Sequence, residues 1–250
     1  FLKEAVAQYE ARLAAVEGGN MRNAIPREGW AIITVPEDNV EDIQGLVKEF
    51  EDMFNTEYAL TENHISLLCE KVEAPHMLIP EEIQDDLINS VTACPNGVFR
   101  MIPAIPDTVE TSMNLSIVKA DTESILIQCL LRSSVDTKKE ELASMVESVF
   151  TLAGAKVEFS GSYSGWNPNL DSKILSTMKE VYEREFKAEP KIMVIHAGLE
   201  CGILGATQTD LDMVSFGPTL LSPHSPDERV NIASVGEFYK LLVATLASIK

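Results

Sequence analysis

Two histidines near the C-terminal end of the sequence could bind a metal or transfer protons, since imidazole does both near neutral pH. His224 stands between two prolines in "LLSPHSPDERV", just ahead of Asp227 and Glu228. The prolines would fix the imidazole, and a carboxylate could hold its second ring nitrogen, as in metal sites. On these residues alone, His224 is a metal ligand, a catalytic base or a histidine packed in a turn.

The second histidine, His196, ends the apolar stretch "KIMVIH", and Cys201 follows it by five residues. A Cys–His pair can act as a nucleophile and its base. No G-x-C-x-G turn or third orienting group surrounds the pair, which favours a small buried thiol under a glycine turn. The chain's cysteines show no C-x-x-C spacing and so indicate neither a disulfide framework nor a zinc knuckle.

A third group of residues is suited to binding a carboxylate. Arg132 comes at the end of the strand-like run "CLLRSS", and Asn23 lies in "RNAIPRE" between two arginines. A guanidinium fork together with an amide would recognise a substrate carboxylate, because both present paired N–H donors. The alternative is that these are ordinary surface residues on an edge strand.

The elements that must position these residues fall into two parts. Up to residue 157, helices alternate with strands that include hairpins, which predicts an α+β layer of antiparallel sheet with helices on one face. We expect helices over 1–17, 37–58, 79–94 and 137–154, the last capped by Thr137 and closed by Gly154. We expect strands over 23–35, 64–73, 98–105, 109–121 and 124–136.

From residue 158 the pattern changes to short apolar strands that alternate with helices around loops rich in Gly, Ser and Asn. This order predicts a mixed or parallel α/β sheet with ligands bound at the strand ends. We expect strands near 155–159, over 191–196 and over 211–216, and helices over 172–186 and 234–249. The two expected domains are therefore residues 1–157 and 158–250.

The composition narrows the class of partner. The 250 residues carry 39 acidic and 20 basic side chains, a net charge of −19, which argues against nucleic acid or an anionic membrane surface. An apolar content of 45% is that of a globular chain, and no apolar run approaches the roughly 20 residues that span a bilayer. We expect a cytoplasmic protein.

Several longer phrases resemble one known family. "IHAGLECG", "DMVSFGPT" and "PHSPDERVNI" are similar, in order and spacing, to the C-terminal third of the aminoacylhistidine (Xaa-His, carnosine-type) dipeptidases. "GGNMRNAIPRE", "VETSMNLSIV", "LLRSSVD" and "GWNPN" resemble the lid domain of that family and its return to the catalytic domain. These enzymes belong to the two-zinc, carboxypeptidase-like metallopeptidases, and the similarity covers essentially the whole chain.

The resemblance implies roles for particular residues. His224 matches a histidine that ligates one zinc ion, and Gly198 matches a glycine whose backbone approaches the substrate. Asn23 and Arg132 match lid residues that hold the C-terminal carboxylate of the substrate. The resemblance further implies two zinc ions, with cobalt or manganese as possible substitutes, and a homodimer formed through the lid at 1–157. Residues 158–250 would then form the C-terminal part of the catalytic domain.

The match leaves out much of the family's chemistry. The H-x-D motif, the bridging aspartate and the Glu-Glu pair that carries the general base have no counterpart in this sequence, so no catalytic residue is assigned within the chain. One histidine cannot hold a catalytic zinc, which needs about three protein ligands. We expect part of a zinc dipeptidase that is inactive alone, with the general base upstream of Phe1. The alternative is a non-catalytic dimerisation module.

Overall fold

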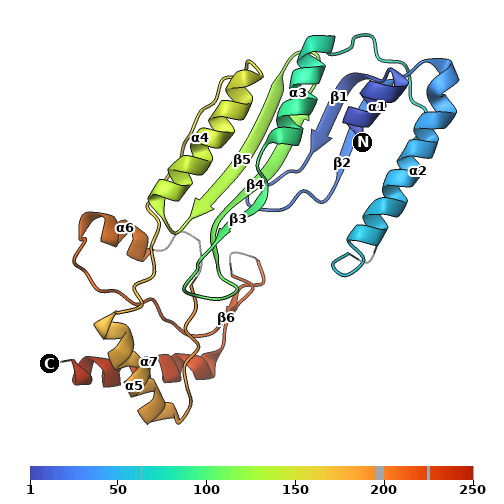
Figure 1. The fold of residues 1–250 in the computed structure, drawn as a ribbon. Helices are drawn as coiled ribbons and strands as arrows, with labels where there is room; N and C mark the ends of the chain where they lie inside the picture. The colour runs from blue at the N-terminus through green and yellow to red at the C-terminus, as the bar shows by residue number, and fades with distance from the viewer. Residues whose placement is uncertain (63, 195–199, 224–225, 250) are drawn as a thin grey trace. The chain divides into compact units, whose positions relative to one another are not determined.

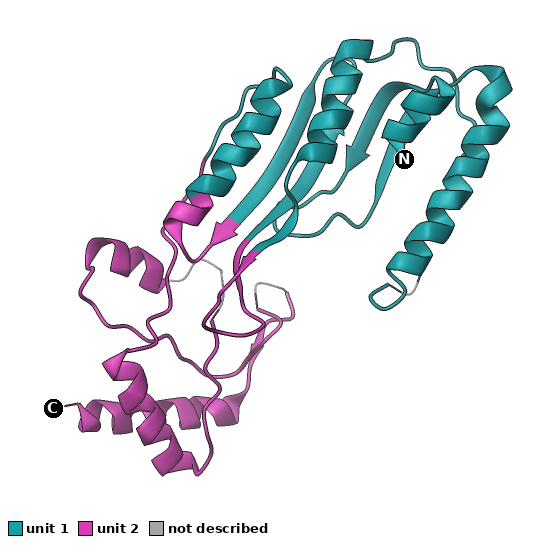
Figure 2. Cartoon of the chain, in the orientation of Figure 1, with its two compact units in different colours: residues 1–99, 112–131, 140–159 teal, residues 100–111, 132–139, 160–250 magenta. Residues whose placement is uncertain are grey.

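The computed structural model of the chain describes residues 1–62, 64–194, 200–223 and 226–249, and these fold into two compact units (Figure 2). Unit 1 consists of residues 1–99, 112–131 and 140–159, and unit 2 of residues 100–111, 132–139 and 160–250. The chain passes back and forth between them, so neither unit is one continuous stretch of sequence.

The sheet of unit 1 has five strands in the order β2-β1-β4-β3, with β5 paired to β4 (Figure 1). The strand β1 pairs antiparallel with both β2 and β4, and the polar turn at Asp121 joins β4 to β5, as predicted. The strands are β1 (Arg12–Gly18), β2 (Gly29–Thr34), β3 (Gly97–Met101), β4 (Val109–Ala120) and β5 (Ile125–Ser133).

Helices cover this sheet, and α1, α3 and α4 lie over the same face of it in Figure 1. Apolar side chains from the sheet and from the helices form three buried clusters, one of which is centred on Leu142 and Phe150 of α4. The mixed α/β class and the helices on one face therefore confirm the prediction for this part. The helices are α1 (Leu2–Tyr9), α2 (Val40–Glu57), α3 (Glu81–Ala93) and α4 (Asp136–Leu152), with a 3-10 turn at Glu37–Asn39.

The predicted N-terminal helix is too long, because the second half of that segment is the strand β1. The helix ends where Glu10 adopts a left-handed conformation with φ of 52°, and the Ala11 N–H returns to the Ala5 carbonyl. Ala11 and Leu13 are then buried at 1% exposure each. The sequence of this segment is equally consistent with a helix. Its backbone hydrogen bonds to β2 and β4 make it a strand.

The strand predicted over 64–73 is also absent. Asn55 of α2 hydrogen-bonds the backbone N–H and carbonyl of Ile65, and Glu51 accepts the N–H of Leu67 at 2.9 Å. The backbone of this segment therefore forms hydrogen bonds with side chains of α2 instead of with a neighbouring strand. In α4 the predicted cap Thr137 lies inside the helix, which starts one residue earlier, whereas Gly154 follows its end with φ of +75°.

In unit 2, the helices α5 and α7 pack against each other, and α5 begins at Ser172, whose hydroxyl accepts the Leu175 N–H at 3.0 Å. Both helices were predicted. The helix α6 was not, because its sequence is rich in glycine. The elements are α5 (Lys173–Phe186), α6 (Glu200–Thr207), α7 (Ile232–Ser248) and the short hairpin of β6 (Leu220–Leu221) and β7 (Arg229–Val230).

The strands predicted for the mixed or parallel sheet of the C-terminal part are not formed in the described residues. Residues 155–159, 191–194 and 211–216 are not strands, and residues 195–196 lie outside the described part of the chain. A strand requires a neighbour that accepts and donates its backbone hydrogen bonds. No described segment pairs with these residues, so a strand-type sequence alone is insufficient.

The helix α7 is apolar on all sides, with Glu237 and Lys240 as its charged residues, and such helices are normally buried. Here Ile232, Tyr239 and Leu246 are exposed at 85%, 65% and 61%. Much of its surface is therefore not covered by the described residues. Among those residues, no helix is both long enough and apolar enough to cross a membrane.

The core of unit 1 leads to a stability prediction. Leu142 of α4 is 0% exposed, whereas Leu152 at the end of the same helix is 89% exposed. Replacing Leu142 by Ala should lower the free energy of unfolding by about 2–5 kcal/mol, because a cavity remains in the cluster. Leu152→Ala should change it by less than about 0.5 kcal/mol. Urea unfolding followed by circular dichroism measures both, and equal losses would contradict the assigned core.

Candidate functional site

Arg132 lies at the penultimate position of β5 and belongs to unit 2, where its side chain is half-buried. Its guanidinium makes no ion pair or hydrogen bond with any residue that the structure describes. The backbone on its C-terminal side is held firmly, because the Ser133 hydroxyl contacts Thr111 at 2.9 Å and accepts the Val135 N–H at 3.0 Å. A partly desolvated guanidinium on a fixed strand end is suited to binding an anion.

The strand that neighbours Arg132 carries a buried polar network in unit 2. Glu110 is 5% exposed, and its carboxylate contacts Arg100 at 3.2 Å and the Thr111 hydroxyl at 3.3 Å. The Ser134 N–H donates to the Glu110 carbonyl at 3.1 Å. The partners of the Glu110 carboxylate offset the cost of its burial, and the network connects the end of β5 to the start of β4.

Asp136 joins two of the motif-bearing segments within unit 2. Its carboxylate accepts the Gly165 N–H at 2.8 Å and the Lys139 ammonium at 3.1 Å. Lys139 also donates to the Tyr163 carbonyl. The segment "SSVD" that follows Arg132 is thereby fixed to "SYSGWNPN", which the sequence predicts as part of a loop.

Two glycines, Gly165 and Gly202, allow the start of α6 to pack on the loop that Asp136 holds. A Cβ on Gly165 would lie 2.5 Å from the Ser134 carbonyl, and one on Gly202 would lie 2.7 Å from the Ser164 carbonyl. Only glycine permits these backbone approaches, since real Cβ atoms do not come so close. The start of α6, which contains Gly202, therefore packs on the loop that Asp136 holds.

Asn23 lies in unit 1, in the connection between β1 and β2, and its side chain is exposed. Its carboxamide makes no hydrogen bond with a described residue. The turn around it is held from β4: Asn114 donates to the carbonyls of Arg22 and Ala24 at 3.1 and 2.7 Å, and the Ser116 hydroxyl donates to Arg22 at 2.6 Å. The backbone of this turn is fixed while the Asn23 side chain stays available.

The remaining predicted site residues cannot be placed. His224, Gly198 and His196 lie outside the described part of the chain, so neither the metal ligand nor the Cys–His pair is tested. Cys201 lies in α6 and is half-buried. In the described ranges, no three His, Cys, Asp or Glu side chains are grouped so that they could hold a metal ion. These residues alone do not form a metal centre.

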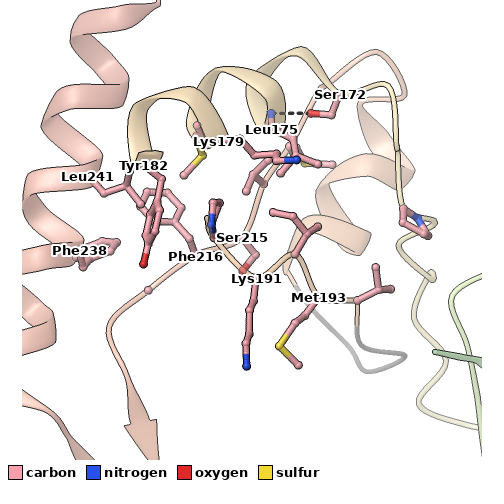
Figure 3. A pocket seen from close by; sticks show the side chains of 18 of the residues that line it. Ser172, Leu175, Lys179, Tyr182, Lys191, Met193, Ser215, Phe216, Phe238 and Leu241 are labelled. Carbon is pink, nitrogen blue, oxygen red and sulfur yellow. Dashed lines mark hydrogen bonds between the residues drawn. The ribbon is translucent and has the colours of Figure 1, made fainter. Parts of the chain in front are cut away.

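Unit 2 also contains a cavity of about 540 Å³ (Figure 3). Its walls come from α5, α7 and the unpaired segments 190–194 and 213–217, and Met193, Phe216, Phe238 and Leu241 are among the side chains labelled there. Neither Arg132 nor Asn23 lines it. The cavity lies inside unit 2 and is lined mostly by apolar side chains.

The chain is similar to two known dipeptidases. No family model matches the chain. It is 39% identical over 249 residues to the cytosol non-specific dipeptidase of Escherichia coli (strain K12), a match that covers 100% of this chain and 51% of that protein. The crystal structure of aminoacylhistidine dipeptidase from Vibrio alginolyticus has the same fold with a TM-score of 0.93 at 38% identity, over 100% of this chain and 51% of that one.

Over its whole length, the chain is similar in sequence and in fold to these two dipeptidases. It spans about half the length of the two relatives. The family resemblance drawn from the sequence motifs is thus confirmed.

Several structural residues of the site were not found from the sequence. Asp136 and Asn114 are polar residues within predicted elements, and such residues are common on surfaces, so their types carried no signal. Gly165 and Gly202 offered a weak one, because isolated glycines outside obvious turns often mark close backbone approaches. Which backbone they approach depends on long-range contacts that spacing does not reveal.

The Asp136 contacts lead to a pH-dependent prediction. Burial alone raises the pKa of the Asp136 carboxyl, but hydrogen bonds from Gly165 and Lys139 and the charge of Lys139 outweigh it and lower the pKa below its ordinary value. The stabilisation is present above the unfolded pKa of about 3.9 and is lost as pH falls through the lower folded pKa.

Asp136→Asn should therefore be less stable than the wild type by a constant amount above about pH 5, and the difference should shrink below about pH 3.9. Thermal unfolding midpoints from pH 2.5 to 7 measure it. A difference that stayed constant down to pH 2.5 would show that the carboxylate charge makes no contribution.

Proposed function

We propose that the chain is part of a metal-dependent dipeptidase of the Xaa-His type, in which it recognises the C-terminal carboxylate of the dipeptide. The observation that supports this is Arg132, a half-buried guanidinium without a described partner, in a chain that matches dipeptidases over its whole length. Asn23 supplies a second donor, and the backbone at Gly198 approaches the substrate. A free carboxylate accepts two parallel N–H bonds from a guanidinium, which an internal peptide bond cannot do.

Binding the C-terminal carboxylate lets the enzyme select substrates by their length. A dipeptide presents its charged end one residue beyond the scissile bond, so a fixed guanidinium at one distance selects dipeptides over longer peptides. Holding that end also orients the peptide bond for attack, which removes part of the entropy cost of the reaction. Arg132 is suited to this, because Ser133, Thr111 and Glu110 fix the strand end that carries it.

The proposed enzyme requires metal ions that the described residues do not hold alone. His224 is the one zinc ligand proposed for this chain, and cobalt or manganese could replace zinc. The other ligands and the general base belong to the half of the relatives' length that this chain does not match. We therefore derive no metal-dependent step from this structure, and we propose that the isolated chain is inactive.

Two further properties belong to the proposal. Residues 1–157 act as a lid and dimerisation domain of a homodimer, while 158–250 complete the catalytic domain. The protein is cytoplasmic, in keeping with the name of its Escherichia coli relative. The incompletely covered apolar surface of α7 and the unpaired segments 191–194 and 212–216 support completion by further polypeptide.

The proposal is tested by reconstitution. The purified chain should release no histidine from Ala-His with or without added zinc. After co-expression with the unmatched half of the Escherichia coli relative, it should hydrolyse Ala-His, and a chelator should remove that activity. Metal-dependent hydrolysis by the chain alone would contradict inactivity, and an inactive but well-folded assembly would favour a non-catalytic dimerisation module.

In the reconstituted enzyme, Arg132→Ala should reduce kcat/KM for Ala-His by the equivalent of about 2–5 kcal/mol, the range for losing one partner of a buried charge pair. The loss should be much smaller for the C-terminal amide of Ala-His, which has no carboxylate. Steady-state kinetics on both substrates measure the difference. Equal losses on both would show that Arg132 maintains the structure and binds no carboxylate.

A further inference from the structure

The connection between β1 and β2 is held by polar side chains of β4. In this strand, Met113 and Leu115 belong to the apolar cluster with α4, whereas their neighbours Asn114 and Ser116 contact the connection. These two side chains supply three hydrogen bonds, at 2.6 to 3.1 Å, to the turn that contains Asn23.

The bonds act on the two carbonyls that flank Asn23 in the sequence. Arg22 accepts from both Asn114 and Ser116, and Ala24 accepts from Asn114. The peptide plane between Arg22 and Asn23 and the plane between Ala24 and Ile25 are thus held at fixed points. These contacts fix the backbone from which the exposed Asn23 side chain extends.

A glycine makes the attachment possible. Gly19 has φ of +73°, and a Cβ there would lie 1.8 Å from the Ser116 carbonyl. Any side chain at this position would push the connection away from β4, and the left-handed φ also favours glycine. Ser116 is 0% exposed, so its hydroxyl has no access to water, and it lies 2.6 Å from the Arg22 carbonyl and 3.0 Å from the Asn114 carbonyl.

We propose that Asn114 and Ser116 are positioning residues for carboxylate recognition: they hold the turn at Arg22 and Ala24 so that the Asn23 carboxamide is presented to the substrate in one orientation. The inference rests on the proposed function, because Asn23 is the group that contacts the carboxylate. Neither positioning residue contacts the substrate. Each acts through the backbone of the turn, and Gly19 allows that turn to lie against the strand.

The first test measures how firmly the turn that contains Asn23 is held in the purified chain. Asn114→Asp keeps the size of the side chain but cannot donate to the two carbonyls. Asn96→Asp is the matched control, since it adds the same charge while its Oδ1 still accepts the Leu115 N–H. Trypsin cleaves after Arg22, at the carbonyl that accepts two of the bonds, and cleavage after the exposed Lys156 provides an internal reference.

Cleavage after Arg22, relative to Lys156, should be faster by at least about fivefold in Asn114→Asp, which loses two hydrogen bonds, and by at least about twofold in Ser116→Ala, which loses one, since each contributes roughly 0.5–1.5 kcal/mol. The Asn96→Asp control should cleave as the wild type does. Unchanged cleavage in both Asn114→Asp and Ser116→Ala would overturn the positioning role, whatever the activity of the assembled enzyme.

The second test separates positioning from the proposed function. In the wild-type chain, the NMR signals of the Asn23 carboxamide should shift with millimolar Ala-His but not with its C-terminal amide. In Asn114→Asp the shift should be reduced by at least about threefold, with Asn96→Asp unaffected. No shift in the wild type would overturn the contact between Asn23 and the carboxylate. The cleavage experiment would still decide whether Asn114 and Ser116 hold the turn. A full shift in Asn114→Asp would overturn the positioning inference.

Discussion

The central strand β4 is the constraint on which most of unit 1 depends, because it pairs with β1, β3 and β5. Its pairing register decides which side chains face the helices and which face the other side, and a slip of one residue would exchange them. Met113 and Leu115 then belong to the core with α4, whereas Asn114 and Ser116 reach the connection between β1 and β2. One register thus determines both the packing of the core and the position of Asn23.

Unit 2 depends on contacts of another kind. Its motif-bearing segments are brought together by backbone approaches at Gly165 and Gly202 and by the carboxylate of Asp136, which binds both a backbone N–H and an ammonium. Such contacts are short and directional, and they place the strand end with Arg132 beside a fixed loop. They do not supply a large apolar core, which explains why this part can be ordered around its polar motifs while α7 stays extensively exposed.

The sequence predicted the helices and hairpin of unit 1 well, because amphipathic periodicity and turn residues act locally. It failed where a distant partner decides the outcome. Arg12–Gly18 has a helical pattern but pairs with two strands, whereas 191–194 and 211–216 have a strand pattern but no described partner. For the candidate site, the motif phrases predicted Arg132 and Asn23, but the residues that support their backbone, such as Asp136 and Asn114, are defined only by contacts between distant segments.

The exposed apolar surface of α7 has a consequence for how this sequence can vary. If water alone covered the helix, polar residues at Ile232, Tyr239 and Leu246 would cost nothing in folding and would improve solubility. If another polypeptide covers it, the same changes would weaken that contact and be removed by selection. Related sequences can therefore be compared at these three positions. The residues found there indicate how much of the surface of α7 is buried in the functional protein.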